Sequence, residues 1–190
     1  MTTLVGIETE DVVVMAADSQ ITEDNLRTIS TATPKIVEVG KYLLGITGDT
    51  RPGDILAYNW KPPAFKVSDN PVQHMGKKVI PSIIKAFTDN GYDWANVDKK
   101  ESGFDYLLAF SGNLFHIACD LSFIQNDSGL YAIGSGGQFA TGYLYGCQQA
   151  EPIYWNPLMA EEYAQQAIIC ATHFDVNTGL PVQLVRQDKL

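Results

Sequence analysis

The sequence lacks any long apolar run, and it is short of positive charge. No uninterrupted apolar segment in it approaches the ~20 residues that a membrane-spanning helix needs. Lysine and arginine together number 13, against 22 aspartates and glutamates, so the net charge is −9. Nucleic acids and anionic membranes both attract clustered lysine and arginine, so we expect neither as a partner. The N-terminus is also too acidic, and too poor in apolar residues, for a signal peptide, which favours a cytoplasmic location.

Cysteine and histidine are scarce as well. Cys119, Cys147 and Cys170 are an odd number of widely spaced thiols, and each falls in an apolar or helical stretch. We therefore expect free, buried cysteines in a reducing compartment rather than a disulfide framework. The three histidines show no metal-ligand spacing with one another or with the cysteines. The sequence predicts neither a metal site nor a cofactor.

Short patterned segments fill the chain from end to end. The 190 residues are 45% hydrophobic, which is enough for a real core. Apolar and β-branched segments predict strands at residues 2–8, 11–17, 35–39, 42–47, 104–110, 113–119, 122–126, 131–133 and 180–186. Helices are predicted at residues 51–60, from 70 to about 91 with a kink at Pro81, from the glycines at 134–137 to about 149, and from 157 to about 174. Polar loops are expected at residues 19–34 and 98–101.

The order of these elements predicts an α+β fold. Antiparallel meanders alternate with pairs of helices, and neither a repeat nor a linker divides the chain. That pattern is typical of two sheets that face each other, with helices on their outer faces. We therefore expect residues 1–190 to form a single domain.

The start of the chain carries a specific chemical signal. Removal of Met1 would leave Thr2 with a free amine and a β-hydroxyl on the same residue. In N-terminal threonine hydrolases the α-amine takes the proton from Oγ as this oxygen attacks a carbonyl. A free α-amine has a pKa of roughly 7.7–8.0, close to the pH at which a general base works best. Most chains that begin Met-Thr-Thr have no such role, so this hypothesis depends on the residues that follow.

Two charged residues could support the nucleophile. Asp18 ends the second predicted strand, and Lys35 opens the apolar segment that follows the first polar loop. A lysine beside the Thr2 hydroxyl would favour the developing alkoxide, and the aspartate would keep that lysine charged. Each residue also has a plainer interpretation, the first as a turn or cap aspartate and the second as a solvated lysine at a strand edge.

Three turns carry further candidates. Gly48 ends a strand just before a helix, where backbone N–H groups can stabilise an oxyanion by ~2.7–4 kcal/mol per donor. Ser135 lies in the segment 134–137, which does not match a phosphate loop, a dinucleotide-binding fingerprint or a nucleophile elbow. The Ser135 hydroxyl could instead hydrogen-bond a catalytic amine. Asp175 and Thr178 flank the turn beyond the last helix and could orient an ammonium. Ordinary strand–helix and helix C-terminal turns explain the first and last of these equally well.

The order of these signals resembles the proteasome β-subunit and HslV-like peptidase family of N-terminal nucleophile hydrolases. The resemblance covers nearly the whole chain and is strongest over residues 2–48 and 131–137. It implies a four-layer αββα sandwich, stacked homo-oligomeric rings around an enclosed chamber, and cleavage of unfolded polypeptides that a partner AAA+ ATPase delivers. By its motifs it implies Thr2 as nucleophile and base, Asp18 and Lys35 as the supporting charge pair, Gly48 as oxyanion donor, and Ser135, Asp175 and Thr178 as the residues that orient the amine.

The sequence departs from the family pattern in two places near these residues. One extra residue separates Asp18 from Lys35, so Pro34 stands where an ungapped count expects the lysine, although Lys35-Ile36 matches the motif. The family usually has serine where this chain has Thr178, which keeps the hydroxyl. By position, the residues expected to line the substrate pocket are Ile21, Ile46, Thr50 and Asp54, a mixed apolar and polar set without a clear preference.

Two alternatives to a threonine endopeptidase remain open. The same constellation would serve an amidase that cleaves small molecules with C–N amide bonds. A non-catalytic ring or scaffold subunit could instead keep the fold and retain Met1. In that case the Thr2 nitrogen is an amide without a basic lone pair, and the proposed base cannot exist.

Overall fold

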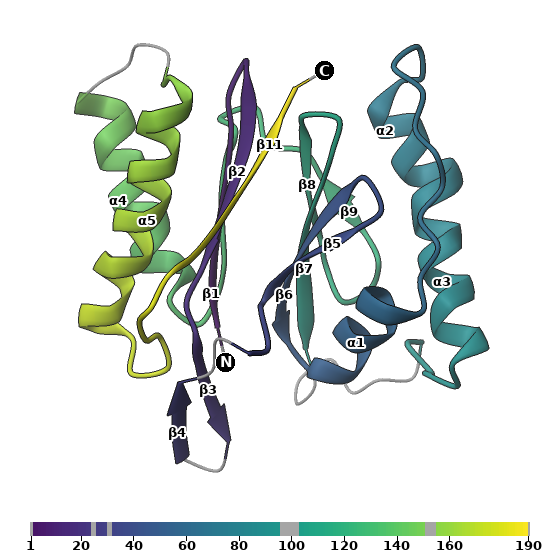
Figure 1. Ribbon diagram of the computed structural model, residues 1–190, viewed down its shortest axis with the longest axis horizontal. Helices are drawn as coiled ribbons and strands as arrows, with labels where there is room; N and C mark the ends of the chain where they lie inside the picture. Colours follow the sequence, from purple (N-terminus) through teal and green to yellow (C-terminus); the bar gives the residue numbers. More distant parts are fainter. Residues whose placement is uncertain (1, 24–25, 30–31, 96–102, 151–154, 190) are drawn as a thin grey trace.

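The computed structural model describes residues 2–23, 26–29, 32–95, 103–150 and 155–189, and the charged loop expected at 98–101 lies outside them. Two antiparallel sheets form its centre (Figure 1). The first has the strand order β10-β1-β2-β11, with β1 at Thr3–Glu8, β2 at Val12–Ala17, β10 at Leu130–Gly134 and β11 at Gln183–Asp188. The second has the order β5-β6-β7-β8-β9, with β5 at Ile36–Val39, β6 at Tyr42–Gly48, β7 at Phe104–Phe110, β8 at Asn113–Ile117 and β9 at Phe123–Ile124.

Helices cover the outer face of each sheet, which makes four layers (Figure 1). α4 (Gly137–Ala150) and α5 (Pro157–Phe174) pack against the first sheet. α1 (Thr50–Tyr58) and a longer helix that ends at Asp89 cover the second sheet. The predicted α+β class and the αββα layer order are confirmed. In the part of the chain that the structure describes, no helix is both long and apolar enough to cross a membrane.

The longer outer helix contains an irregular turn next to a proline. Asn70 caps its start, because its side chain accepts a hydrogen bond from the backbone N–H of Gln73 at 2.9 Å. The helix then runs through α2 (Pro71–His74), a π-helical turn η1 (Met75–Val79) and α3 (Ile80–Asp89). Pro81 has no N–H to donate, and its ring crowds the carbonyl one turn earlier, so a wider turn relieves the conflict. The irregularity predicted at Pro81 therefore takes the form of a π-turn just before it.

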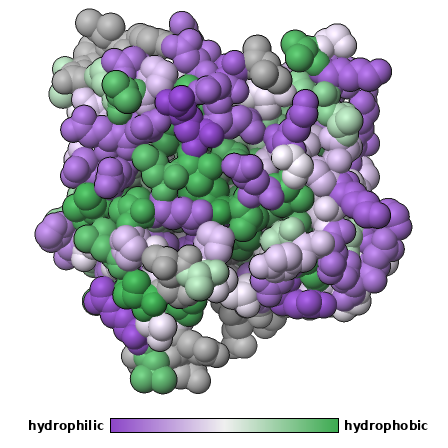
Figure 2. Space-filling view, in the orientation of Figure 1, coloured by the Kyte–Doolittle hydropathy of each residue, from purple (hydrophilic) through white to green (hydrophobic). Residues whose placement is uncertain are grey.

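Three apolar clusters of different composition hold the layers together. Aliphatic side chains fill the space between the sheets, among them Leu4, Val13, Met15, Leu43, Leu107 and Leu114. Aromatic rings dominate under α1 and α3, including Tyr42, Phe87, Phe104, Tyr106, Phe110 and Phe115. Alanines recur where α4 and α5 meet the first sheet, at Ala16, Ala140, Ala160, Ala164 and Ala167, and such small residues let helix and sheet approach closely. In the space-filling view, hydrophobic side chains gather over the central strands and hydrophilic ones over the outer helices (Figure 2).

A small hairpin lies where the sequence predicted only a polar loop. β3 (Gln20–Glu23) and β4 (Leu26–Ile29) pair antiparallel and project from one end of the sandwich (Figure 1). The loop prediction for residues 19–34 was therefore wrong over these strands. The physical reason is that β-branched residues such as Ile21, Thr22 and Thr28 favour extended backbone, even among polar neighbours.

Antiparallel pairing brings the candidate residues to that same end of the sandwich. Thr3, the first residue of β1, lies opposite Gly134 at the end of β10. Ala17, the last residue of β2, lies opposite Leu4 near the start of β1. β6 also ends here, at Gly48, and α1 starts beside it (Figure 1). Each turn that carried a chemical signal in the sequence thus opens onto one region.

Candidate active site

A buried ion pair lies directly after β2. Asp18 is 1% exposed, and its Oδ1 accepts a hydrogen bond from Lys35 Nζ at 2.6 Å. The same Nζ donates to the carbonyl oxygen of Gln20, also at 2.6 Å. Three backbone N–H groups complete the surroundings of the carboxylate: Thr3 donates to Oδ1 at 2.9 Å, and Gln20 and Gly179 donate to Oδ2 at 3.0 Å each. The structure therefore brings the two predicted charged residues together.

Lys35, and not Pro34, is the residue that reaches Asp18. The extra residue between Asp18 and Lys35 therefore leaves this contact intact. Burial is the largest influence on the pKa of Lys35 and lowers it, while the attraction and the hydrogen bond of Asp18 act in the opposite direction. The net result is a pKa below the ordinary lysine value, so Lys35 loses its proton at a lower pH than a solvated lysine does.

The glycine-rich turn after β10 holds the backbone of Thr2. The backbone N–H of Ser135 donates to the Thr2 carbonyl oxygen at 2.9 Å. Gly134 has a φ of +88°, and a Cβ at this position would lie 1.9 Å from the same carbonyl oxygen. Only glycine allows so close an approach in this conformation. The turn therefore fixes the residue that begins the described chain, as well as presenting the Ser135 side chain.

Hydroxyl groups and one carboxylate form a chain of hydrogen bonds beside Thr2. Asp175 Oδ2 accepts from Ser135 Oγ at 2.7 Å and from Thr178 Oγ1 at 2.6 Å. Thr178 Oγ1 also lies 2.5 Å from Thr3 Oγ1. Burial, the largest influence, raises the pKa of Asp175, but the hydrogen bonds from Thr178, Ser135 and Asn177 together outweigh it and lower the pKa below its ordinary value. Ser135, Asp175 and Thr178, predicted as one group, are brought together.

A cavity of about 110 Å³ opens beside these residues. Thr2, Lys35 and Gly48 all contribute to its wall. Gly48 has a φ of +83°, and a Cβ on it would lie 1.9 Å from the carbonyl oxygen of Gly103, so no side chain fits here. The full lining consists of Thr2, Gln20, Ile21, Thr33, Pro34, Lys35, Ile46, Gly48, Thr50, Gly53 and Asp54. All four residues expected to line a substrate pocket are therefore in the wall of this cavity.

A larger cavity of about 470 Å³ lies at the opposite end of the sandwich. Its lining includes Glu8 at the end of β1, Leu130 at the start of β10 and Lys189. None of the candidate residues contributes to it. Size alone therefore does not indicate where the chemistry of this chain lies.

Sequence reasoning missed two residues that support the site. Thr3 donates its N–H to Asp18 and places its hydroxyl in the chain of hydrogen bonds. Gln183 ties β11 to the start of β5: its Oε1 accepts from the N–H groups of Lys35 and Ile36 at 2.9 and 3.1 Å. The doubled threonine was a visible signal for Thr3. No local pattern marks Gln183, because its contacts lie almost 150 positions away in the chain.

The four layers and the two antiparallel sheets are shared with solved structures that include an HslV protein, so the chain has their fold. Part of its sequence is also similar to proteasome subunits. The family model described as proteasome subunit matches residues 1–57. No curated protein sequence matches the chain significantly.

Solved structures of low sequence identity share the fold over almost the whole chain. BPH from Thiobacillus denitrificans superposes with a TM-score of 0.74 at 22% identity, covering 98% of this chain and 97% of that one. A second structure of that protein, in complex with epoxomicin, has the same TM-score and identity. Eukaryotic HslV from Trypanosoma brucei has a TM-score of 0.68 at 19% identity, over 98% of this chain and 99% of that one. Anbu, an ancestral β-subunit from Yersinia bercovieri, has a TM-score of 0.68 at 14% identity, over 98% and 82%.

Proposed function

We propose that this protein is a threonine endopeptidase of the proteasome type, with Thr2 as nucleophile and its own α-amine as general base. The observation that carries the proposal is the position of Thr2, which shares the wall of one cavity with Lys35 and Gly48. Its backbone is held there by the N–H of Ser135. A hydroxyl nucleophile, a nearby cation and a wall of bare backbone around one cavity are the parts that acyl transfer requires.

In the proposed reaction, Thr2 Oγ attacks the carbonyl carbon of the scissile bond while the α-amine takes the hydroxyl proton. The carbonyl oxygen becomes an oxyanion, and the N–H of Gly48 is its proposed donor. The amine then passes the proton to the leaving nitrogen, the C–N bond breaks, and the acyl group stays on Thr2 as an ester. A water molecule, deprotonated by the same amine, hydrolyses the ester and restores the free threonine.

The remaining candidate residues have supporting roles in this proposal. Lys35 provides positive charge that favours the alkoxide of Thr2, and Asp18 keeps that lysine protonated at neutral pH. Ser135, Asp175 and Thr178 orient the α-amine through the hydroxyl–carboxylate chain. The amine exists only after Met1 has been removed, so we also propose that the active protein begins at Thr2.

Intact-mass measurement and one substitution test the proposal together. The active protein should have the mass of the chain without Met1, and Thr2→Ala should lower the rate of peptide cleavage by at least ~10³-fold. Thr88→Ala is the matched control, because Thr88 is an exposed threonine on α3, away from the site. Active protein that retains Met1, or a Thr2→Ala variant with undiminished activity, would refute the mechanism.

Covalent probes give a second readout of the same threonine. A β-lactone or a boronate that reacts with terminal threonine should add its mass to the wild-type protein and not to Thr2→Ala. The Thiobacillus relative was solved in complex with epoxomicin, so we expect this compound to bind here as well. Casein and small amides should be offered in parallel, since turnover of the small amides alone would identify an amidase instead.

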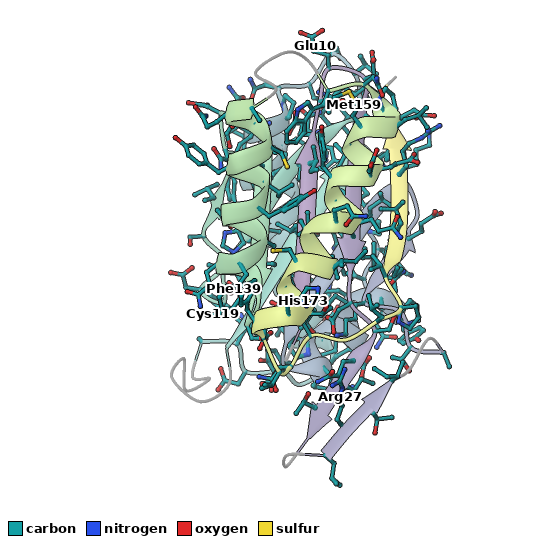
Figure 3. The ribbon with its side chains drawn as sticks, turned by 90° about the vertical axis from the view of Figure 1, so that its left-hand side faces the viewer. Glu10, Arg27, Cys119, Phe139, Met159 and His173 are labelled. Atoms are coloured by element: carbon teal, nitrogen blue, oxygen red, sulfur yellow. The ribbon has the colours of Figure 1, made fainter. Side chains whose placement is uncertain are left out.

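We further propose that the protein assembles into stacked homo-oligomeric rings that receive unfolded chains from an AAA+ ATPase. The support in this chain is a group of exposed apolar side chains on the β3–β4 hairpin, at the end of α5 and in the turn after it: Ile21, Leu26, Ile29, Phe174 and Val176. The hairpin, which carries Arg27, projects from the body of the molecule (Figure 3). A two-stranded hairpin is marginally stable alone, so a neighbouring subunit would stabilise it.

Light scattering tests the assembly. Leu26→Asp should dissociate the oligomer, because it places a charge where an apolar contact is expected. Val67→Asp is the matched control, since Val67 is equally exposed at 74% but lies between α1 and α2. A stable monomer of the wild-type protein would contradict the ring.

A further inference from the structure

The ion pair of Asp18 and Lys35 joins two separate parts of the fold. Asp18 directly follows β2 in the first sheet, and Lys35 directly precedes β5 in the second. The ammonium of a lysine is carried on a flexible stem of methylene groups. The position of Lys35 Nζ therefore depends on how firmly the backbone of this residue is held relative to β2.

Packing alone does not hold Lys35, because two cavities border it. One is the cavity of about 110 Å³ whose wall includes Thr2. The other has a volume of about 220 Å³, and Asp18 and Gln183 contribute to its wall while Thr2 does not. Close packing is what normally fixes a side chain in a protein interior. Beside open space of this size, the position of Lys35 depends on polar contacts instead.

Gln183 makes such contacts with the start of β5. Its Oε1 accepts hydrogen bonds from the backbone N–H groups of Lys35 and Ile36, at 2.9 and 3.1 Å. Its Nε2 donates to the carbonyl oxygen of Ile36 at 2.6 Å. β5 lies at the edge of the second sheet, with β6 as its neighbour, and an edge strand leaves backbone groups without a partner strand. The amide of Gln183 therefore takes the place of a further strand at this point.

The register of β11 connects the same glutamine to Asp18. Gln183 lies opposite Ala17, the residue just before Asp18, in the pairing of β11 with β2. One side chain thus spans from the sheet that presents the carboxylate to the strand that presents the amine. Such a contact fixes the separation of the two backbones. A displacement of ~1 Å at a catalytic group can cost ~10²-fold in rate, so this separation matters for catalysis.

A second glutamine on β11 makes similar contacts away from the ion pair. Gln187 is half buried, as Gln183 is. Its Oε1 accepts from the N–H of Gly112 at 3.3 Å, and its Nε2 donates to the carbonyl oxygen of Lys41 at 3.1 Å. Lys41 lies in the turn that follows β5. The two glutamines therefore tie β11 to the two ends of β5, and only Gln183 does so beside Lys35.

We propose that Gln183 is a positioning residue for Lys35, and that it holds the lysine backbone so that Nζ stays at the cavity that Thr2 lines. Gln183 is not in the wall of that cavity, so it acts through the lysine and not on a substrate. The inference rests on the proposed endopeptidase function. It adds a residue on which the rate of the reaction depends.

Gln183→Met tests the proposal on the mature protein, because methionine has a similar length and makes none of these hydrogen bonds. With a fluorogenic peptide that the wild type cleaves, kcat should fall by at least ~10-fold while KM stays within ~2-fold. The rate at which a β-lactone acylates Thr2 should fall by the same factor. Gln187→Met is the matched control, and its kcat should stay within ~2-fold of the wild type. Gln183→Asn replaces Gln183→Met if that variant does not fold, because its shorter amide cannot span the same contacts.

A double variant separates positioning from general destabilisation. In a Lys35→Ala background, Gln183→Met should change the acylation rate by less than ~2-fold, because the group that Gln183 positions is already gone. The inference would be overturned by a further ~10-fold fall in that background, by an unchanged kcat in Gln183→Met, by equal losses in Gln183→Met and Gln187→Met, or by loss of folding in both Gln183 variants.

Each of those results leaves the proposed function standing as long as cleavage by the wild type depends on Thr2. If the wild type shows no Thr2-dependent cleavage, the proposed function fails and this inference fails with it.

Discussion

Replacement of Asp18 by asparagine removes one negative charge from a buried position and keeps the size of the side chain. Each carboxylate oxygen accepts two hydrogen bonds, Oδ1 from Thr3 and Lys35 and Oδ2 from Gln20 and Gly179. Asparagine has one acceptor oxygen, so two of these donors lose their acceptor whichever way the amide turns. Lys35 also loses the charge that balances it.

The expected cost follows from those contacts. A buried donor without an acceptor costs ~1–3 kcal/mol, and breaking a buried ion pair by removing one partner costs ~3–5 kcal/mol. We therefore expect Asp18→Asn to lower the free energy of unfolding by ~3–5 kcal/mol. Lys35→Met should cost less, ~1–3 kcal/mol, because the carboxylate would still accept from three backbone N–H groups.

Urea denaturation, followed by tryptophan fluorescence, measures both costs and their coupling. The protomer concentration must be the same throughout, because assembly shifts apparent stability. The double variant Asp18→Asn/Lys35→Met should cost less than the sum of the single changes, since the second change removes the unpaired charge that the first creates. Asp89→Asn is the control: it breaks an exposed pair with Lys85 and should cost under ~0.5 kcal/mol. If Lys35→Met costs more than Asp18→Asn, the account of this ion pair is wrong.

Two further pairs of substitutions and one pH profile have outcomes that the structure predicts. Gly134→Ala should destabilise the protein by at least ~2 kcal/mol in thermal melts, because Gly134 has a φ of +88° and an added Cβ would lie 1.9 Å from the Thr2 carbonyl oxygen. Gly142→Ala, on open helix surface, should instead stabilise the protein by ~0.5–1 kcal/mol. The reverse order of stabilities would contradict this reasoning. Hydrogen bonds depress the pKa of Asp175, so its stabilising contribution is present above the pKa of the unfolded chain and is lost as pH falls through the lower folded value. Thr178→Val should move acid unfolding to higher pH and Thr178→Ser should not; identical acid titrations would exclude the effect. Burial lowers the pKa of Lys35 from the ordinary lysine value of 10.5, so as pH rises kcat/KM should begin to fall before pH 10.5 is reached. A kcat/KM that stays constant up to that pH would contradict the proposed role of Lys35.

Much of the fold could be predicted because local sequence patterns, such as turns, helix caps and apolar segments, mark its strands and helices. The turn at residues 8–11 joins two apolar segments and forms the hairpin of β1 and β2, and Asn70 caps the helix that it was expected to start. The predicted strand at Phe104–Phe110 has the same bounds in the structure. The β3–β4 hairpin was missed because polar residues surround its β-branched ones, so the segment does not have the apolar pattern of a strand. Its apolar side chains are exposed and make few contacts within this chain.

The candidate site was predictable as a set of residue types and not as a geometry. In the sequence, Asp18 and Lys35 each had a plainer interpretation. Only the structure shows that they form an ion pair, with Lys35 Nζ 2.6 Å from Asp18 Oδ1. The hydroxyls of Thr3 and Thr178 come together across 175 positions of sequence. The residues expected to line a pocket could be named by position, but the balance of charge within that pocket could not.

By itself, the sequence determined the order of strands and helices, the αββα layering they can build, and the presence of a threonine whose amine and hydroxyl share one residue. These are consequences of local pattern, because hydrophobic period, turns and caps depend on neighbouring residues. Tertiary structure alone decided that Lys35 is paired with Asp18, and that Gly134 and Ser135 hold the backbone of Thr2. Those contacts join residues far apart in the chain, so they exist only once the register between strands has set which ends of the two sheets lie together.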